Sequence, residues 1–160
     1  GGREMDEIMG GRIVEPSGDD LREVLERRIM AMPSLHAETG PFPGKRFGWI
    51  GGEPEGGSRM AAASFYAALM GAECLSLAGA EGPVIVEGAF GGNAAFLRML
   101  ATATGRVVRG AGQGAGTGLG AALLAGPLTV PGPKGLEVMP ETDHLWAGWG
   151  APWRGAVARW

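Results

Sequence analysis

Two glycine-rich stretches contain the residues whose chemistry could hold a nucleotide. The first runs from Gly88 to Gly92, follows the apolar run 83–87 and ends at Asn93. Glycines let a backbone approach a ligand closely, and free N–H groups at the start of a helix attract anions or donate hydrogen bonds. The amide of Asn93 adds a polar group. This stretch therefore predicts a nucleotide-binding loop.

The second stretch matches a dinucleotide fingerprint only loosely. Gly110, Gly112 and Ala115 have the G-x-G-x-x-A spacing, but the chain contains 31 glycines, so such spacings arise by chance. The fingerprint also requires an acidic residue about 20 positions later, and no acidic residue lies between Gly110 and Glu137. No Gly-Lys-Ser/Thr follows the glycines, which argues against a Walker-type phosphate loop. The stretch favours a flexible surface turn leading into a closely packed helix at about 117–125.

The sequence predicts neither catalytic residues nor metal ligands. His36 and His144 lie far apart, without cysteine or carboxylate neighbours in a metal-binding pattern. Cys74 is the single cysteine and lies in an apolar run, which predicts a buried thiol and no disulfide. Asp19 and Asp20 are typical first-turn helix charges.

The elements that position the first stretch form an α/β unit. Residues 83–87 predict a buried strand and 88–92 a loop. Asn93 then caps a helix over 94–104 that Gly105 terminates. A second strand follows at 106–109, and so short a crossover favours a parallel pair. Ligands in open α/β sheets bind at the carboxyl ends of strands, which is where the first stretch lies.

The other segments predict a helical framework with one long loop. Ser17 and Asp20 have capping-box spacing before a helix whose apolar face runs to Met32. Residues 33–58 predict a loop with a short strand at 47–50. The segment 58–77 is apolar almost all round, which indicates a central buried helix. Four tryptophans of the C-terminal tail are expected to dock on this domain: Trp146, Trp149, Trp153 and Trp160.

Composition indicates one globular domain or a piece of one. The 160 residues are 45% apolar, carry a net charge of −3 and have a pI near 5.4, without a basic block. We therefore expect no nucleic-acid partner. We expect no apolar run to approach the roughly 18 residues of a membrane span, so no membrane partner is predicted. The single cysteine fits a cytoplasmic location. The sequence leaves open whether the protein forms a homodimer.

The order of these motifs resembles the C-terminal lobe of FGGY carbohydrate kinases. The resemblance covers about residues 40–126. That lobe typically has a Pro-x-x-x-Gly-Glu-Arg loop, a long apolar helix, a strand running into a glycine-rich adenosine loop, a helix ending in Thr-Gly-Arg and a final Gly-Ala-Ala-x-x-Ala-Gly helix. The matching segments here are GPFPGKR, GSRMAAASFYAALMGAECLSL, GPVIVEGAFGGNAAFLRMLATATGRVV and GTGLGAALLAG.

The resemblance implies an actin-like ATPase or ribonuclease-H-like lobe, with residues 1–160 forming an incomplete nucleotide-side lobe of a two-lobed sugar kinase. ATP with Mg²⁺ and a small-molecule sugar are the implied cofactors and substrate, and the γ-phosphate would pass to a sugar hydroxyl. Ala89 and Phe90 stand where the family often has further glycines, and Lys45 where its loop has Glu. Five residues are implied to line the adenine and ribose: Gly88, Ala89, Gly91, Gly92 and Asn93.

The resemblance also implies that essential parts lie in another lobe. The Asp-x-Gly-Thr phosphate loop, the sugar-binding residues and the catalytic aspartate belong to the N-terminal lobe of the family. We therefore expect this chain alone to be a truncated, inactive half. Two alternatives stay open: a non-catalytic scaffold that keeps the fold, suggested by Ala89 and Phe90, and a dinucleotide-binding oxidoreductase domain based on Gly110 to Ala115.

Overall fold

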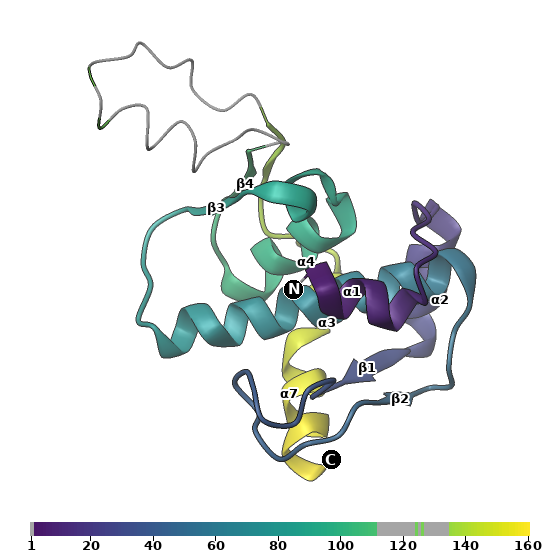
Figure 1. Cartoon of the computed structure of the whole chain (residues 1–160). Helices are drawn as coiled ribbons and strands as arrows, with labels where there is room; N and C mark the ends of the chain where they lie inside the picture. The colour runs from purple at the N-terminus through teal and green to yellow at the C-terminus, as the bar shows by residue number, and fades with distance from the viewer. Residues whose placement is uncertain (1, 112–123, 125, 127–134) are drawn as a thin grey trace.

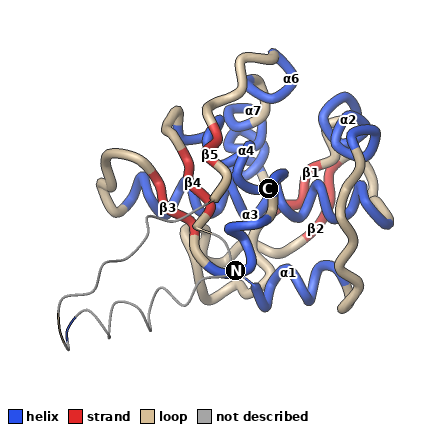
Figure 2. Tube along the Cα trace, turned by 90° about the horizontal axis from the view of Figure 1, so that it is seen from above, coloured by secondary structure: helices blue, strands red, loops and turns tan. Residues whose placement is uncertain are grey.

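A long central helix, α3 (Gly56–Leu77), organises the molecule, with a three-stranded sheet beside one end and a two-stranded sheet beside the other (Figures 1 and 2). The computed structural model describes residues 2–111, 124, 126 and 135–160. The expected helix at 117–125 and the second glycine-rich stretch beyond Ala111 thus lie almost wholly outside the described residues.

Helix α3 is the core helix that the sequence predicts at 58–77. By length and composition alone it could cross a membrane, so the expectation that no apolar stretch reaches that length was wrong. Within the protein, 56% of its most apolar stretch is buried. Four elements pack around it: helices α1 (Gly2–Met9), α2 (Gly18–Arg27) and α4 (Ala94–Thr104) and strand β1 (Met30–Met32). Its last turn extends beyond this cover. Cys74 is therefore exposed, contrary to the predicted buried thiol.

The strand-loop-helix-strand unit is present, and its two strands are parallel. Val84 pairs with Val108 in the parallel ladder, and a further strand joins antiparallel to make a mixed sheet. Residues 88–92 form a 3₁₀ turn rather than an irregular loop, because the N–H of Asn93 donates to the carbonyl of Phe90 at 3.1 Å. In chain order the elements are β3 (Val84–Val86), η1 (Gly88–Gly92), α4 (Ala94–Thr104), β4 (Val108–Gly110) and β5 (Glu137–Val138).

The N-terminal segments form two helices and a β-ribbon. Helix α1 (Gly2–Met9) precedes α2 (Gly18–Arg27), and the predicted capping box between Ser17 and Asp20 is confirmed. Helix α2 ends earlier than predicted, at a left-handed residue, Arg28. The buried run that follows is β1 (Met30–Met32), antiparallel to β2 (Gly48–Ile50). Apolar residues buried in succession here belong to a strand, whereas the sequence suggested one helical face.

The C-terminal helices dock on this framework as the tryptophans predict. Helices α6 (His144–Ala147) and α7 (Gly150–Arg159) follow β5. The indole N–H of Trp153, a buried residue, donates to the carbonyl of Ala31 at 2.9 Å and so ties α7 to β1. Trp146 and Trp149 pack edge-on against Phe65 of α3. The tail therefore completes the core around α3.

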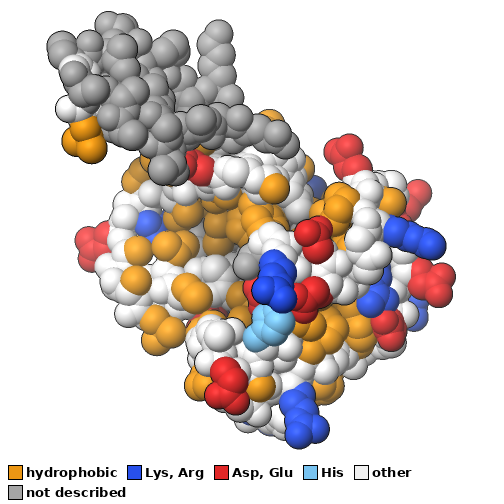
Figure 3. Space-filling view, in the orientation of Figure 1, with side chains coloured by type: hydrophobic (Ala, Val, Ile, Leu, Met, Phe, Trp, Pro, Cys, Tyr) orange, Lys and Arg blue, Asp and Glu red, His pale blue; other side chains and the backbone are white. Residues whose placement is uncertain are grey.

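Charged side chains are interspersed on the face of the molecule seen in Figure 3. Lys and Arg alternate with Asp and Glu there, and hydrophobic side chains reach the surface between them. No single basic patch gathers among the described residues of this face, in keeping with the net charge of −3.

Candidate functional site

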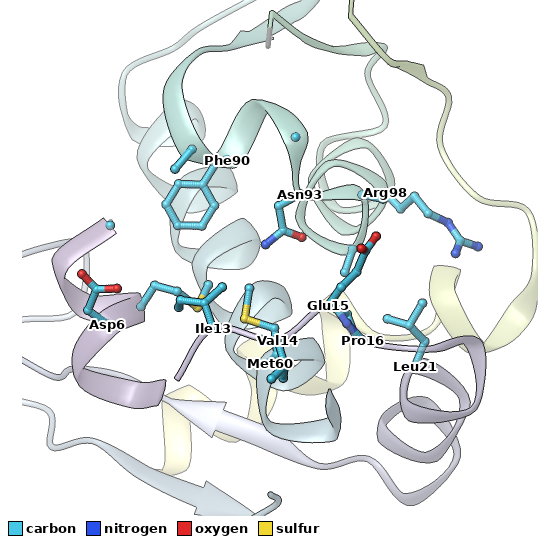
Figure 4. A pocket seen from close by; sticks show the side chains of 16 residues that line it. Asp6, Ile13, Val14, Glu15, Pro16, Leu21, Met60, Phe90, Asn93 and Arg98 are labelled. Carbon is cyan, nitrogen blue, oxygen red and sulfur yellow. The ribbon is translucent and has the colours of Figure 1, made fainter. Parts of the chain in front are cut away.

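A pocket of about 510 Å³ lies where the N-terminal segment faces η1 and the start of α4 (Figure 4). One wall comes from α1, the segment 13–16 and Leu21. Met60 of α3 contributes from below, and η1 with the first turns of α4 forms the opposite wall. We call it the apolar pocket. It is lined by Gly2, Met5, Asp6, Ile13, Val14, Glu15, Pro16, Leu21, Met60, Ala89, Phe90, Gly92, Asn93, Ala94, Ala95 and Arg98.

Three of the five residues predicted to contact a nucleotide line this pocket. Ala89, Gly92 and Asn93 belong to its lining, and a side chain added at Gly92 would enter open space. Gly88 does not line it and takes a positive φ of 75° just after β3. Gly91 is the buried residue of η1. The η1 segment therefore presents one side to the pocket and packs its other side on the sheet.

Gly110 explains how η1 is held on the sheet. A Cβ on Gly110 would lie 2.1 Å from the carbonyl oxygen of Gly91 and 2.9 Å from a methyl group of Leu97. Only glycine allows this close approach. The first glycine of the second stretch is thus a buried packing position in β4, not part of a surface turn as predicted.

Asn93 connects the pocket wall to the central helix. Its side-chain oxygen accepts from the N–H of Phe96 at 3.0 Å, which confirms the predicted cap of α4. Its amide N–H donates to the hydroxyl of Ser64 at 2.9 Å, and that hydroxyl donates to the carbonyl of Met60 at 2.8 Å. Ser64 is completely buried. Asn93 therefore fixes α4 on α3, and only its remaining N–H and lone pair could serve a ligand.

Two neighbouring apolar residues are the one sequence signal that points to the opposite wall. Ile13 and Val14 are 56% and 40% exposed, unusual for such side chains, and both line the pocket. Asp6 and Glu15 place carboxylates on the side facing η1 and α4 (Figure 4). Within the described part of the chain, neither carboxylate has a hydrogen-bond or ion-pair partner. The pocket thus combines apolar walls with two free acceptor groups.

Arg98 is the cationic residue among the described residues that line the pocket, but it is engaged elsewhere. Its guanidinium lies 4.1 Å above the ring of Trp146, and its Nε donates to Glu141 at 2.6 Å. Figure 4 shows it extending away from Phe90. Its positive charge is therefore partly neutralised, and the free charges at the pocket are negative.

A second hollow, of about 570 Å³, lies between α2 and the segment leading into α3. The hydroxyl of Ser58 is 3.1 Å from a carboxylate oxygen of Asp20 and 2.6 Å from one of Glu23. We call it the acidic hollow. It is lined by Asp20, Glu23, Arg27, Ile29, Gly51, Gly52, Glu53, Pro54, Glu55, Gly56, Gly57 and Ser58.

Hydrogen bonds lower the pKa of two carboxyl groups in the acidic hollow. Bonds from Ser17 lower the pKa of Asp20, and the Ser58 bond together with Arg27 lowers that of Glu23. The contacts of Ser58 with these two carboxylates join α3 to α2. Among the described residues, no group of three His, Cys, Asp or Glu side chains could hold a metal ion. Neither hollow therefore offers a protein cage for Mg²⁺.

Comparisons with known proteins show the family and the fold of the chain. Residues 1–133 match the family profile described as carbohydrate kinase FGGY, C-terminal domain. The fold is similar to the solved structure of a carbohydrate kinase from Novosphingobium aromaticivorans, with 30% sequence identity and a TM-score of 0.78. That alignment covers 99% of this chain and 36% of the kinase, so this chain spans little more than a third of that protein's length. No curated protein matches the chain.

Proposed function

The chain belongs to the FGGY carbohydrate kinase family through its C-terminal domain, and from this premise we propose that it is the nucleotide-binding side of an ATP-dependent carbohydrate kinase. Its α/β fold with a mixed sheet matches the actin-like, ribonuclease-H-like C-terminal lobe of such a kinase. The intact enzyme would transfer the γ-phosphate of ATP to a hydroxyl group of a sugar.

The apolar pocket is the observation that carries this proposal. The nucleoside part of a nucleotide is a flat base with apolar faces and a polar edge, joined to a ribose with two free hydroxyl groups, and small-molecule sites are mostly apolar with a few placed polar groups. The pocket matches that description and lies at the carboxyl end of β3, where α/β folds bind ligands. Its volume of about 510 Å³ is within the usual range for such sites.

The charges of the pocket favour one orientation of the nucleotide. Asp6 and Glu15 would repel phosphate groups, whereas their oxygens can accept hydrogen bonds from ribose hydroxyls or an amino group of the base. The nucleoside would therefore lie inside the pocket and the phosphates would point out of it. Mg²⁺ would neutralise charge on the phosphates during transfer, with its protein ligands supplied from outside the described residues.

The chain alone is expected to bind nucleotide without transferring phosphate. Phosphoryl transfer depends on holding the phosphates, the acceptor hydroxyl and a base in line, and a misplacement of about 1 Å can cost roughly a hundredfold in rate. The pocket supplies a place for the nucleoside only. An N-terminal lobe would have to supply the phosphate loop, the sugar contacts and the catalytic carboxylate.

Calorimetric titration with ADP, ATP and NAD tests the nucleotide role. We expect binding of the two adenine nucleotides and no selective binding of NAD. A chain that folds but binds none of them would favour the non-catalytic scaffold. Selective NAD binding would contradict the kinase assignment and support the oxidoreductase alternative.

A coupled assay of ADP release tests whether phosphate transfer requires residues outside this chain. It would use pentoses, deoxyhexoses and polyols with two proteins: this 160-residue chain and the longest reading frame that contains it. We expect sugar-dependent ADP release from the longer protein only. Turnover by the chain alone would show that the catalytic base lies within it.

A further inference from the structure

Phe90 is the aromatic side chain of the apolar pocket. Among the described residues that line the pocket, no other carries an aromatic ring. Phe90 is only half-buried, whereas most apolar side chains of the core around α3 are fully buried. A partly exposed ring at a pocket wall has apolar surface that a ligand can cover. Figure 4 shows the ring on the η1 wall, across from Asp6 and Ile13.

The position of the Phe90 ring is fixed before any ligand binds. Its backbone carbonyl accepts the N–H of Asn93 at 3.1 Å within the η1 turn. Its ring packs against Phe96, with centroids 4.6 Å apart and planes tilted by 39°. Phe96 is 8% exposed and does not line the pocket, so it supports the ring from the α4 side. The part of the Phe90 ring that Phe96 leaves uncovered faces the pocket.

We infer that Phe90 contacts the base of the bound nucleotide and makes the pocket prefer purines to pyrimidines. This inference rests on the proposed nucleotide role of the pocket. Contact between a base and an aromatic ring is sequence-tolerant, but it strengthens with the area of overlap, and a purine offers two fused rings where a pyrimidine offers one. The carboxylates of the facing wall can accept a hydrogen bond from an amino group on either kind of base, so they do not distinguish purines from pyrimidines. The contact with Phe90 is what depends on the size of the base.

Titration of ADP and CDP tests the inference. These nucleotides share the ribose, the diphosphate and an exocyclic amino group, so their difference in affinity isolates the size of the base. We expect the wild-type chain to prefer ADP. Phe90→Leu keeps an apolar side chain but removes the ring, and it should weaken ADP binding roughly tenfold while affecting CDP less. Phe90→Tyr keeps the ring and should retain the preference.

Phe47→Leu is the matched control, because Phe47 is also half-buried and packs edge-on against Trp49 and Tyr66, but lies outside the pocket. It should leave both affinities unchanged. Equal loss of ADP and CDP binding in a folded Phe90→Leu chain, or no loss at all, would overturn the inference alone. A folded wild-type chain that binds neither nucleotide would instead overturn the proposed function and this inference with it.

Discussion

The apolar pocket and the acidic hollow have similar volumes, about 510 and 570 Å³, but their carboxylates are engaged to different extents. In the acidic hollow Asp20 and Glu23 accept hydrogen bonds from Ser58, Glu53 pairs with Arg59, and Glu55 alone has no side-chain partner among the described residues. In the apolar pocket Asp6 and Glu15 have no partner among the described residues. A hollow in which most carboxylates are engaged with a neighbouring helix joins helices, whereas one with only free carboxylates beside apolar walls suits a ligand. Volume alone does not distinguish the two.

The largest effect is expected from Gly110→Ala, which tests whether packing holds the η1 wall of the apolar pocket. The new Cβ would meet the carbonyl oxygen of Gly91 at 2.1 Å, so backbone must shift. We expect the free energy of unfolding to fall by about 2–3 kcal/mol, at the upper end for overpacked cores, and ADP binding to weaken as η1 moves. Urea unfolding measures the first effect and calorimetry the second.

Gly92→Ala is the control for that substitution, because a Cβ there enters open space without a positive φ. Its stability should stay within a few tenths of a kcal/mol of the wild type. If Gly110→Ala were equally harmless, η1 would not depend on its contact with β4.

Asn93→Ala tests whether side-chain hydrogen bonds also hold the wall of the apolar pocket in place, as they join the helices at the acidic hollow. The substitution removes the cap of α4 and leaves the Ser64 hydroxyl without its donor from Asn93. We expect a loss of about 1–2 kcal/mol in the free energy of unfolding. Asn93→Asp restores the cap acceptor but not the N–H donor, so it should recover part of the loss. No recovery would indicate that the cap contributes little.

Local sequence signals predicted the η1 wall of the pocket. Asn93 and Gly105 delimit α4 as caps do, and the short crossover gave the parallel pair β3 and β4. These features depend on residues within about 25 positions of one another in the sequence. Backbone hydrogen bonding and cap chemistry act over that range, so the sequence contained the necessary information.

The opposite wall could not be predicted in the same way. Asp6 and Glu15 reach the pocket only because α1 and the segment after it pack across α3 toward η1, a contact between distant parts of the chain. Similarly, the run Met30–Met32 was predicted as helix because its pairing with Gly48–Ile50 depends on a loop that brings the two together. Tertiary contacts decide both outcomes, and local propensity does not record them.

Ala94→Leu tests directly whether the apolar pocket, and not the acidic hollow, holds the nucleotide. Ala94 is exposed in the first turn of α4 and lines the apolar pocket, so a leucine there would occupy volume that a nucleoside needs. We expect ADP affinity to fall about tenfold, equivalent to about 1.4 kcal/mol, with little change in stability. Ala151→Leu is its match, an exposed alanine in the first turn of α7 outside the pocket. Equal ADP affinities for the two variants would place the nucleotide elsewhere.

The smallest effect is expected in the acidic hollow, as a dependence of stability on acid pH. Hydrogen bonds from Ser17 lower the pKa of Asp20 below its usual 3.8, and the Ser58 bond with Arg27 lowers that of Glu23 below its usual 4.5. Carboxyl groups with a lower pKa in the folded state stabilise the fold above the unfolded pKa, and this contribution disappears as pH falls through the folded pKa. The free energy of unfolding should therefore decline below about pH 5.

Ser58→Ala should flatten that decline, because it removes the hydroxyl that both carboxylates share. Solvent screens these partly exposed carboxylates, so the loss of stability at pH 7 should be small. Ser34→Ala is the matched control: Ser34 is a buried serine whose hydroxyl donates to the carbonyl of Phe42 at 2.9 Å, with no carboxylate involved. It should lower stability equally at pH 3 and pH 7.

Urea unfolding at both pH values, together with ADP titration at pH 7, distinguishes the two hollows. Ser58→Ala should change the pH dependence of stability and leave ADP affinity unchanged. A weakened ADP affinity in Ser58→Ala would mean that the acidic hollow also contributes to ligand binding.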